Sequence, residues 1–328
     1  MTVEKPIEKM TLEEIRTEAE KHVAAEVWTW VNGGTETGFT LERNCSALEK
    51  ILLRLKVLHG LDRADTTVTV LGQTVRTPVV VAPFANTVRL HPEAELGLAR
   101  GAREAGAMMF LGPVSAYPAE EITKATTAPV AWNGDPLRDR EKLAAQIREA
   151  ERAGCCAVGL CVDDFMGVKI NDLLRPLANR ALSPEEVRAL RKETSLPFFL
   201  KGIMTKEDAL AAADAGVDAI VVSNHGGRVL DCCQASIEVL PEIVKAVGGK
   251  IEVLVDGGFR RGTDILKALA LGAKAVLVGR PMCWGLAAAG ERGVGRVLSM
   301  MTEELARAMV LANVADLTSP PRECLAEA

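Results

Sequence analysis

The residues of this chain that could do chemistry follow short apolar runs. The clearest case is Ser223-Asn224-His225-Gly226-Gly227-Arg228, which comes directly after the apolar run 218–222. His225 is one of four histidines, and an imidazole can exchange a proton near neutral pH, so it is the leading candidate for a general base. The segment therefore predicts a base, a cation and flexible backbone at the end of one strand. Active sites of α/β barrels lie at such strand ends.

Two glycine-arginine segments later in the chain suggest an anion site. Asp256-Gly257-Gly258-Phe259-Arg260 and Gly279-Arg280-Pro281 each follow an apolar run. Glycines allow backbone N–H groups to approach an anion, and arginine offers two parallel donors to a phosphate. The glycines alone would fit ordinary tight turns equally well. Together with Arg260 and Arg280 they favour a phosphate site in the last two loops of a barrel.

The elements that must position these groups alternate regularly from Pro78 onward. Each short apolar run is followed by a charged amphipathic segment, which is the βαβ pattern of a parallel sheet. Eight strands can be counted, whereas a doubly wound sheet more often stops at five or six. We therefore predict an α/β fold, a (β/α)8 TIM barrel. The expected strands are 79–82, 107–111, 130–132, 157–162, 198–201, 219–222, 252–255 and 275–278, and the expected helices are 93–105, 118–124, 140–153, 184–193, 206–214, 235–247, 263–271 and one from about 285.

The first part of the chain lacks this alternation. Apolar residues at helical spacing predict one helix over 11–31 and another over 41–53, and the stretch 68–75 predicts a hairpin that turns at Gly72-Gln73. We expect residues 1–77 to form an arm that packs on a barrel of residues 78–328, so that the whole chain is one structural domain.

Composition and charge limit the classes of function. The 328 residues carry a net charge of −5 with both signs mixed along the chain, which argues against a nucleic-acid or membrane surface. No run reaches the roughly 18 apolar residues of a membrane span, and no targeting segment is recognisable, so we expect a cytoplasmic protein. The eight cysteines show no Cys-x-x-Cys spacing, which predicts reduced thiols and no metal.

Several of these segments also carry a family resemblance. The stretches 223–231, 256–263 and 278–281, together with 199–209 and 80–83, resemble the FMN-dependent 2-hydroxy-acid oxidases and dehydrogenases. This family includes glycolate oxidase, lactate oxidase and flavocytochrome b2. The resemblance extends over nearly the whole chain from residue 27 to about 315.

The resemblance implies that FMN lies across the barrel mouth. Arg260, Arg280 and the amides of Gly258 and Gly279 would hold its phosphate, and Lys201 would face the N1/O2 edge of the flavin. His225 would be the base and Asp163 its partner, while Arg228 would grip the substrate carboxylate. Further contacts with the cofactor would come from Ala82, Pro83, Ala85, Gly112, Asn133, Cys161, Ser223 and Asp256. Members of the family commonly form tetramers, which predicts a homo-oligomer.

The residues that bind the substrate in this family are changed in this chain. The family pocket carries two tyrosines and a second arginine, but this chain has one tyrosine, and Trp30 and Asp135 take the two tyrosine positions. The segment after Asp163 is shortened, and Lys169 is the nearest cation to the lost arginine, with Arg175 as a weaker substitute. An acidic Asp135 would repel a small carboxylate unless a cation or a ligand amine offsets it.

These changes predict an FMN-dependent oxidoreductase that oxidises a 2-hydroxy acid, or a related α-hydroxy or α-amino carbon, of a substrate larger than lactate or glycolate. One alternative is an FMN-dependent isomerase or decarboxylase on the same barrel. The other is a flavin-binding protein that has lost activity.

Overall fold

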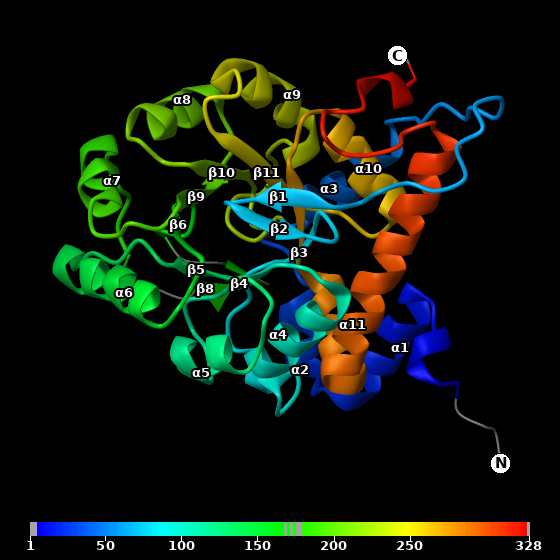
Figure 1. Ribbon diagram of the computed structural model, residues 1–328. Helices are drawn as coiled ribbons and strands as arrows, with labels where there is room; N and C mark the ends of the chain where they lie inside the picture. The colour runs from blue at the N-terminus through cyan, green and yellow to red at the C-terminus, as the bar shows by residue number, and fades with distance from the viewer. Residues whose placement is uncertain (1–4, 167–168, 171–172, 175–178, 327–328) are drawn as a thin grey trace.

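Eight parallel strands form a closed barrel at the centre of the molecule (Figure 1). The computed structural model describes residues 5–166, 169–170, 173–174 and 179–326. Around the barrel the strands follow chain order, and the last strand pairs with the first, which confirms the predicted (β/α)8 fold. The strands are β3 (Val79–Val81), β4 (Met109–Leu111), β5 (Val130–Gly134), β6 (Ala157–Cys161), β9 (Phe198–Ile203), β10 (Ala219–Val222), β11 (Glu252–Asp256) and β12 (Ala275–Val278).

Alternating side chains of these strands fill two separate layers. Val80, Phe110 and Phe199 point into the barrel interior and are fully buried there, whereas Val79 and Val81 belong to the layer between the strands and the helices. The surrounding helices bury one apolar face each, as their spacing predicts. They are α4 (Ala94–Ala105), α5 (Ala119–Lys124), α6 (Arg140–Arg152), α7 (Pro184–Arg191), α8 (Lys206–Asp214), α9 (Ser236–Val247), α10 (Gly262–Ala270) and α11 (Arg280–Leu311).

Helix α11 starts earlier than the sequence suggested. It begins at Arg280 rather than near residue 285, because Gly279, the residue directly after β12, is already the N-cap. The helix is interrupted at Ala289 and Gly290, where the Glu93 carboxylate accepts a hydrogen bond from the Glu291 N–H at 2.7 Å. In the part of the chain that the structure describes, no helix has both the length and the apolar character that crossing a membrane requires.

The single helix predicted over 11–31 is wrong. The chain forms α1 (Leu12–His22) and α2 (Ala25–Asn32), and the backbone is extended at Val23 and Ala24. The break lets the chain turn between two packing surfaces. Helix α1 lies along α11 (Figure 1), while the end of α2 reaches the barrel mouth, where the Val31 carbonyl accepts a hydrogen bond from Arg280.

The rest of the N-terminal arm touches both ends of the barrel. Helix α3 (Phe39–Glu49) lies at the carboxyl ends of the strands, whereas the hairpin of β1 (Val68–Val70) and β2 (Gln73–Val75) packs into the barrel interior from the opposite end. The hairpin turns at Leu71-Gly72, one residue before the predicted position, because both residues adopt the positive φ that a two-residue hairpin turn requires. The arm therefore closes one end of the barrel and shapes the other.

The remaining elements are short. A two-stranded sheet of β7 (Lys169–Ile170) and β8 (Leu173–Leu174) lies between β6 and α7. The 3-10 turns are η1 (Ile7–Lys9), η2 (Thr87–Arg89) and η3 (Arg322–Cys324). The boundary between the arm and the barrel at residue 77 stays a prediction.

Candidate active site

A cavity opens at the carboxyl ends of the barrel strands. Most of the side chains predicted for the site line it, although they come from seven different strand ends and from α2. Those lining residues are Trp30, Ala82, Pro83, Ala85, Asn133, Asp135, Cys161, Lys201, His225, Arg228, Asp256, Gly258, Arg260, Gly279 and Arg280. The position agrees with the face on which barrel enzymes carry their chemistry.

The predicted base is held through its ring and through its backbone. His225 follows β10 by three residues, and its Nδ1 lies 3.3 Å from Asp163 Oδ1. Its backbone N–H donates to Ser223 Oγ at 3.1 Å. The backbone of His225 has a φ of 56°, an uncommon conformation for a residue with a side chain and one that occurs at functional sites. Because Asp163 engages Nδ1, the other ring nitrogen, Nε2, remains for a substrate.

Asp163 is ionised beside this imidazole. Burial favours the protonated carboxyl, but the charge and hydrogen bond of His225 outweigh it and lower the pKa of Asp163 to about 2. Its Oδ1 also accepts a hydrogen bond from Cys161 Sγ at 3.0 Å. Ligand atoms of Cys161, Asp163 and His225 all lie within 4.8 Å of one another, a spacing that hydrogen bonds among them already explain.

A buried cation lies at the base of the cavity. Lys201 Nζ forms an ion pair with Asp256 Oδ2 at 3.2 Å and donates to Ser223 Oγ at 2.9 Å. Burial works against the charge, but the surrounding acids, Asp256 first, raise the pKa of Lys201 above its usual value. The lysine is therefore a fixed positive charge that the buried carboxylates hold in place.

Lys201 lies inside β9, and a bulge follows it. Val221 pairs with Lys201 and Val222 pairs with Ile203, so Gly202 is the extra residue in the ladder. A Cβ atom on Gly202 would lie 2.6 Å from the Asp163 carboxyl carbon. Gly202, which the sequence did not single out, thus makes room for the partner of the base.

The opposite side of the cavity is rich in arginine. Arg280 Nε donates to the Val31 carbonyl at 3.1 Å, and Arg260 lies over the Trp284 ring at 5.2 Å. Burial, together with the neighbouring guanidinium groups of Arg228 and Arg260, lowers the pKa of Arg280 to about 9. Several buried cations that repel one another favour binding of an anion between them.

These features fit FMN. Gly279 presents open backbone to the cavity, since the nearest atom to an added Cβ would be the Ala82 Cβ at 3.9 Å. Asn133 Oδ1 is buried without a hydrogen-bond partner among the described residues and can pair with an edge of the flavin ring. Arg260, Arg280 and Gly279 would hold the phosphate, while Lys201 and Asn133 would contact the ring system.

An aromatic wall lies beside Arg228. The rings of Trp30 and Phe84 meet edge to face, with centroids 5.3 Å apart. The Arg228 guanidinium carbon lies 5.2 Å from the Trp30 centroid and 5.5 Å from the Phe84 centroid, and Arg228 Nη1 donates to the Val31 carbonyl. Trp30 therefore contributes an apolar surface and a cation contact in place of a tyrosine hydroxyl.

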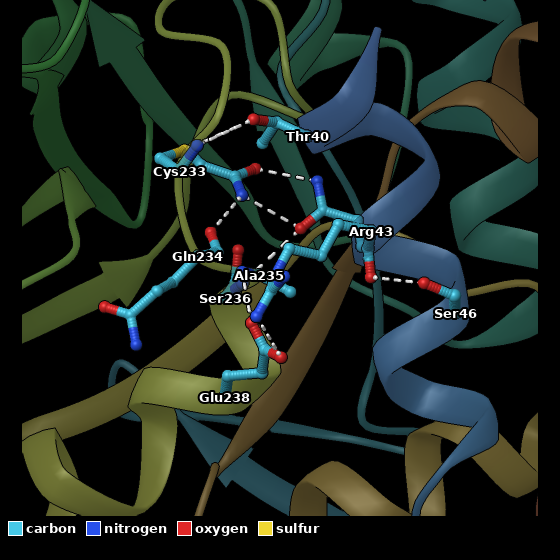
Figure 2. Close-up of polar contacts among 10 residues, drawn as sticks. Thr40, Arg43, Ser46, Cys233, Gln234, Ala235, Ser236 and Glu238 are labelled. Atoms are coloured by element: carbon cyan, nitrogen blue, oxygen red, sulfur yellow. Dashed lines mark hydrogen bonds and ion pairs between the residues drawn. The ribbon is translucent and has the colours of Figure 1, made fainter.

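The arm is fixed to this site by polar contacts. Asp231, at the end of the His225 loop, accepts hydrogen bonds from the backbone N–H groups of Thr37 and Thr40. Figure 2 shows the neighbouring contacts, in which Thr40 Oγ1 accepts from the Cys233 N–H and Arg43 forms an ion pair with Glu238. The loop that carries the base is thus ordered by residues from the N-terminal arm.

Three predicted residues differ from expectation in their contacts. Gly112 does not line this cavity, because a Cβ there would lie 2.7 Å from the Phe84 carbonyl oxygen, so it makes room for the loop after β3 instead. Ser223 is fully buried beneath the cavity and positions Lys201 and His225. Asp163 acts through His225 and does not line the cavity. The side chain of Lys169 and all of Arg175 lie outside the described residues.

The structure also brings in residues that the sequence did not mark. Asp164 is buried and lines the cavity beside Asp135. The other lining residues that the sequence did not mark come from the strand-end loops and from β12, namely Phe84, Asn86, Pro113, Val114, Gly226, Gly257, Phe259, Leu277 and Val278. The sequence did contain a signal for Asp164, because it directly follows Asp163, and two adjacent carboxylates after a strand can serve two functions.

Comparison with known proteins agrees with this site. The model of the family described as FMN-dependent dehydrogenase matches residues 19–175 and 164–327. The chain therefore belongs to the FMN-dependent dehydrogenase family and is an FMN-dependent oxidoreductase.

Individual relatives are similar over most of their length. A 4-hydroxymandelate oxidase of Amycolatopsis orientalis is 39% identical, with 92% of this chain and 94% of the relative covered. A glycolate oxidase of Spinacia oleracea is 37% identical, with 92% and 91% covered. The crystal structure of mandelate oxidase with (S)-2-phenylpropionate superposes with a TM-score of 0.90 at 39% identity, covering 96% of this chain and 97% of that one.

Proposed function

We propose that this enzyme oxidises the α-carbon of a 2-hydroxy acid larger than lactate or glycolate and releases a 2-oxo acid. The observation that carries the proposal is His225, which lines the cavity and pairs with Asp163, opposite a cluster of arginines that fits the FMN phosphate. Relatives named for the oxidation of glycolate and 4-hydroxymandelate support the reaction class.

His225 supplies the proton transfer. Nε2 is placed to accept the proton of the substrate hydroxyl, and the ionised Asp163 stabilises the imidazolium that forms. The same carboxylate fixes which ring nitrogen faces the substrate. FMN, when bound, supplies an acceptor for the hydrogen and electron pair that leave the α-carbon.

Lys201 and Arg228 supply fixed positive charge. Lys201 is buried and held by Asp256, so it can stabilise negative charge that develops at the base of the cavity. Arg228 is buried against Trp30 and Phe84, where a carboxylate could accept hydrogen bonds from its guanidinium. The aromatic wall favours a substrate with more surface than lactate offers.

A substrate screen with spectroscopy tests the proposal. The purified holoenzyme is mixed anaerobically with 2-hydroxy acids that range from glycolate to mandelate, and the flavin absorbance is recorded. Lasting bleaching with stoichiometric formation of the 2-oxo acid supports oxidation. Turnover without net flavin reduction would instead support an isomerase or decarboxylase, and a protein that binds FMN without any reaction would support a binding role.

We also infer that the chain forms a homo-oligomer, a tetramer by family resemblance, and that it acts in the cytoplasm on a small molecule without a nucleic-acid or membrane partner. Exposed apolar side chains at Leu52, Leu55, Val57 and Leu58 support assembly. Light scattering on the purified protein tests the oligomeric state, and cell fractionation tests the location.

A further inference from the structure

Two aspartates line the cavity together with His225. Asp135 follows β5 and Asp164 follows β6, which are paired neighbours in the barrel. Both residues line the cavity, and Asp164 is only 8% exposed. Burial, followed by the charge of Asp164, raises the pKa of Asp135 to about 6, so the two carboxylates are close enough to repel each other.

These carboxylates have unused hydrogen-bonding capacity. Asp164 Oδ1 is buried without a hydrogen-bond partner among the described residues. Both residues form hydrogen bonds through their backbone, since the Asp164 carbonyl accepts from Asn179 Nδ2 and the Asp135 carbonyl accepts from the Leu137 N–H, each at 2.9 Å. A buried acceptor without a donor is costly, and because Asp164 belongs to the lining of the cavity, a ligand bound there can supply the donor.

The cations around the cavity contact other groups. Lys201 is paired with Asp256, and Arg280 donates to backbone carbonyls of the arm. Arg260 donates to the Phe259 carbonyl. Within the described ranges, no ion pair joins a lysine or arginine to Asp135 or Asp164. The cavity therefore presents positive charge at its arginine side and negative charge beside the base.

We propose that Asp135 and Asp164 bind a positively charged nitrogen of the substrate, so that the preferred substrate is a 2-hydroxy acid bearing an ammonium group. This inference rests on the proposed function and names the substrate class for the same site. The substrate carboxylate lies with Arg228, and the ammonium group donates to the two aspartates. Charge complementarity of this kind rejects substrates without the cation, because they leave the buried carboxylates unpaired.

Isosteric substrate pairs test the proposal directly. The side chain of 4-amino-2-hydroxybutanoate differs from that of 2-hydroxypentanoate by an ammonium group in place of a methyl group. We expect the holoenzyme to favour the amino compound about 10- to 100-fold in kcat/KM, the range for a hydrogen bond to a charged group. Equal rates, or a preference for 2-hydroxypentanoate, would overturn the proposal and leave the oxidase function intact.

Variants that neutralise one aspartate at a time test whether these residues cause the preference for the amino compound. Asp135→Asn and Asp164→Asn keep the size of each side chain, and each is expected to lower the ratio of kcat/KM for the amino compound to kcat/KM for 2-hydroxypentanoate. Asp62→Asn, at an exposed position outside the cavity, is the matched control and should keep the preference. A preference that survives in both cavity variants would show that other residues select the substrate.

A binding measurement separates this inference from the reaction itself. 4-Aminobutanoate and pentanoate form the same isosteric pair without the hydroxyl, and their binding to the holoenzyme is followed by the change in flavin absorbance. Tighter binding of 4-aminobutanoate that Asp164→Asn abolishes supports the cation site even if no hydroxy acid is oxidised. Equal binding of the two compounds overturns it even if oxidation of uncharged hydroxy acids is found.

Discussion

The side-chain amides of Asn44 and Asn224 bond to each other in both directions. Each Nδ2 donates to the other residue's Oδ1 at 2.9 Å, and both residues are buried. Asn44 belongs to α3 of the arm, whereas Asn224 precedes His225. Because the pair joins the arm to the loop of the base, folding of the arm and geometry of the active site depend on each other.

Removing one member of this pair should lower both the stability of the protein and its activity. Asn44→Ala leaves the Asn224 amide partly unsatisfied, and we expect the free energy of unfolding to fall by about 1–3 kcal/mol. Urea titration measures this loss, and kcat should fall as well because the His225 loop is released. Ser46→Ala, which changes an exposed hydroxyl on the same helix, should leave both quantities close to those of the wild type.

Loss of the imidazole should abolish most of the proton transfer. We expect His225→Gln to slow anaerobic reduction of the flavin by about 10²- to 10⁴-fold, the contribution of a general base. FMN content should stay unchanged. His22→Gln, an exposed histidine on α1 that contacts Glu18, is the control. Reduction at the wild-type rate in His225→Gln would show that another group takes the proton.

The arginine cluster should govern retention of the cofactor. Arg260→Met keeps a long side chain without the charge, and we expect the dissociation constant of FMN to rise about 10- to 100-fold through loss of a charge-assisted hydrogen bond. Quenching of FMN fluorescence during titration of the apoprotein measures the affinity. The control is Arg261→Met, because Arg261 is exposed and pairs with Glu304. Equal affinities in the two variants would rule out Arg260 as a phosphate ligand.

Two variants of the buried pair Lys201 and Asp256 should differ in their free energy of unfolding but both lower the midpoint potential of the flavin. Lys201→Met leaves Asp256 without its cation, so unfolding should become easier by about 3–5 kcal/mol. The double variant Lys201→Met/Asp256→Asn should regain much of this stability. Both variants should lower the midpoint potential of the flavin by on the order of 30–60 mV, because the fixed charge that favours the reduced form is gone. An unchanged potential would assign Lys201 a purely structural role.

The raised pKa of Asp135 should make the free energy of unfolding depend on pH. Its pKa is raised to about 6 in the folded protein, above the value near 3.9 for an unfolded chain. The folded state therefore binds more protons between about pH 4 and 6, and stability falls as the pH rises through this window. Asp135→Asn should thus be more stable than the wild type by about 1–3 kcal/mol at pH 7, and the difference should vanish below about pH 4. Urea titrations at each pH measure the difference, with Asp62→Asn, at an exposed position outside the cavity, as the control.

Local patterns in the sequence were sufficient to predict the barrel. Runs such as 219–222 and 275–278 are short and apolar, and each is followed by an amphipathic helix, so the chain order alone implies the topology. The break at Val23 and Ala24 was not predictable, since both residues tolerate a helix and only the two different packing surfaces of α1 and α2 require a turn.

The site was predictable where the motif itself carries the chemistry. His225 and Arg260 lie in the loops after β10 and β11, and Arg280 begins α11 just after β12, so their place at the cavity follows from the fold. Gly202 and Asp164 were missed for different reasons. Gly202 leaves space for the Asp163 carboxylate, which only the three-dimensional packing reveals. Asp164 was missed because its neighbour Asp163 already had a predicted function.

The position of the arm has a consequence for protein synthesis. The hairpin β1–β2 and helix α3 leave the ribosome before any strand of the barrel, so their apolar sides must wait for partners that are made later. Even the segment around Leu53 is secured by a bridge to Leu325, near the other end of the sequence. Until those partners are synthesised, the nascent chain exposes these apolar sides, which are the kind of surface that chaperones shield.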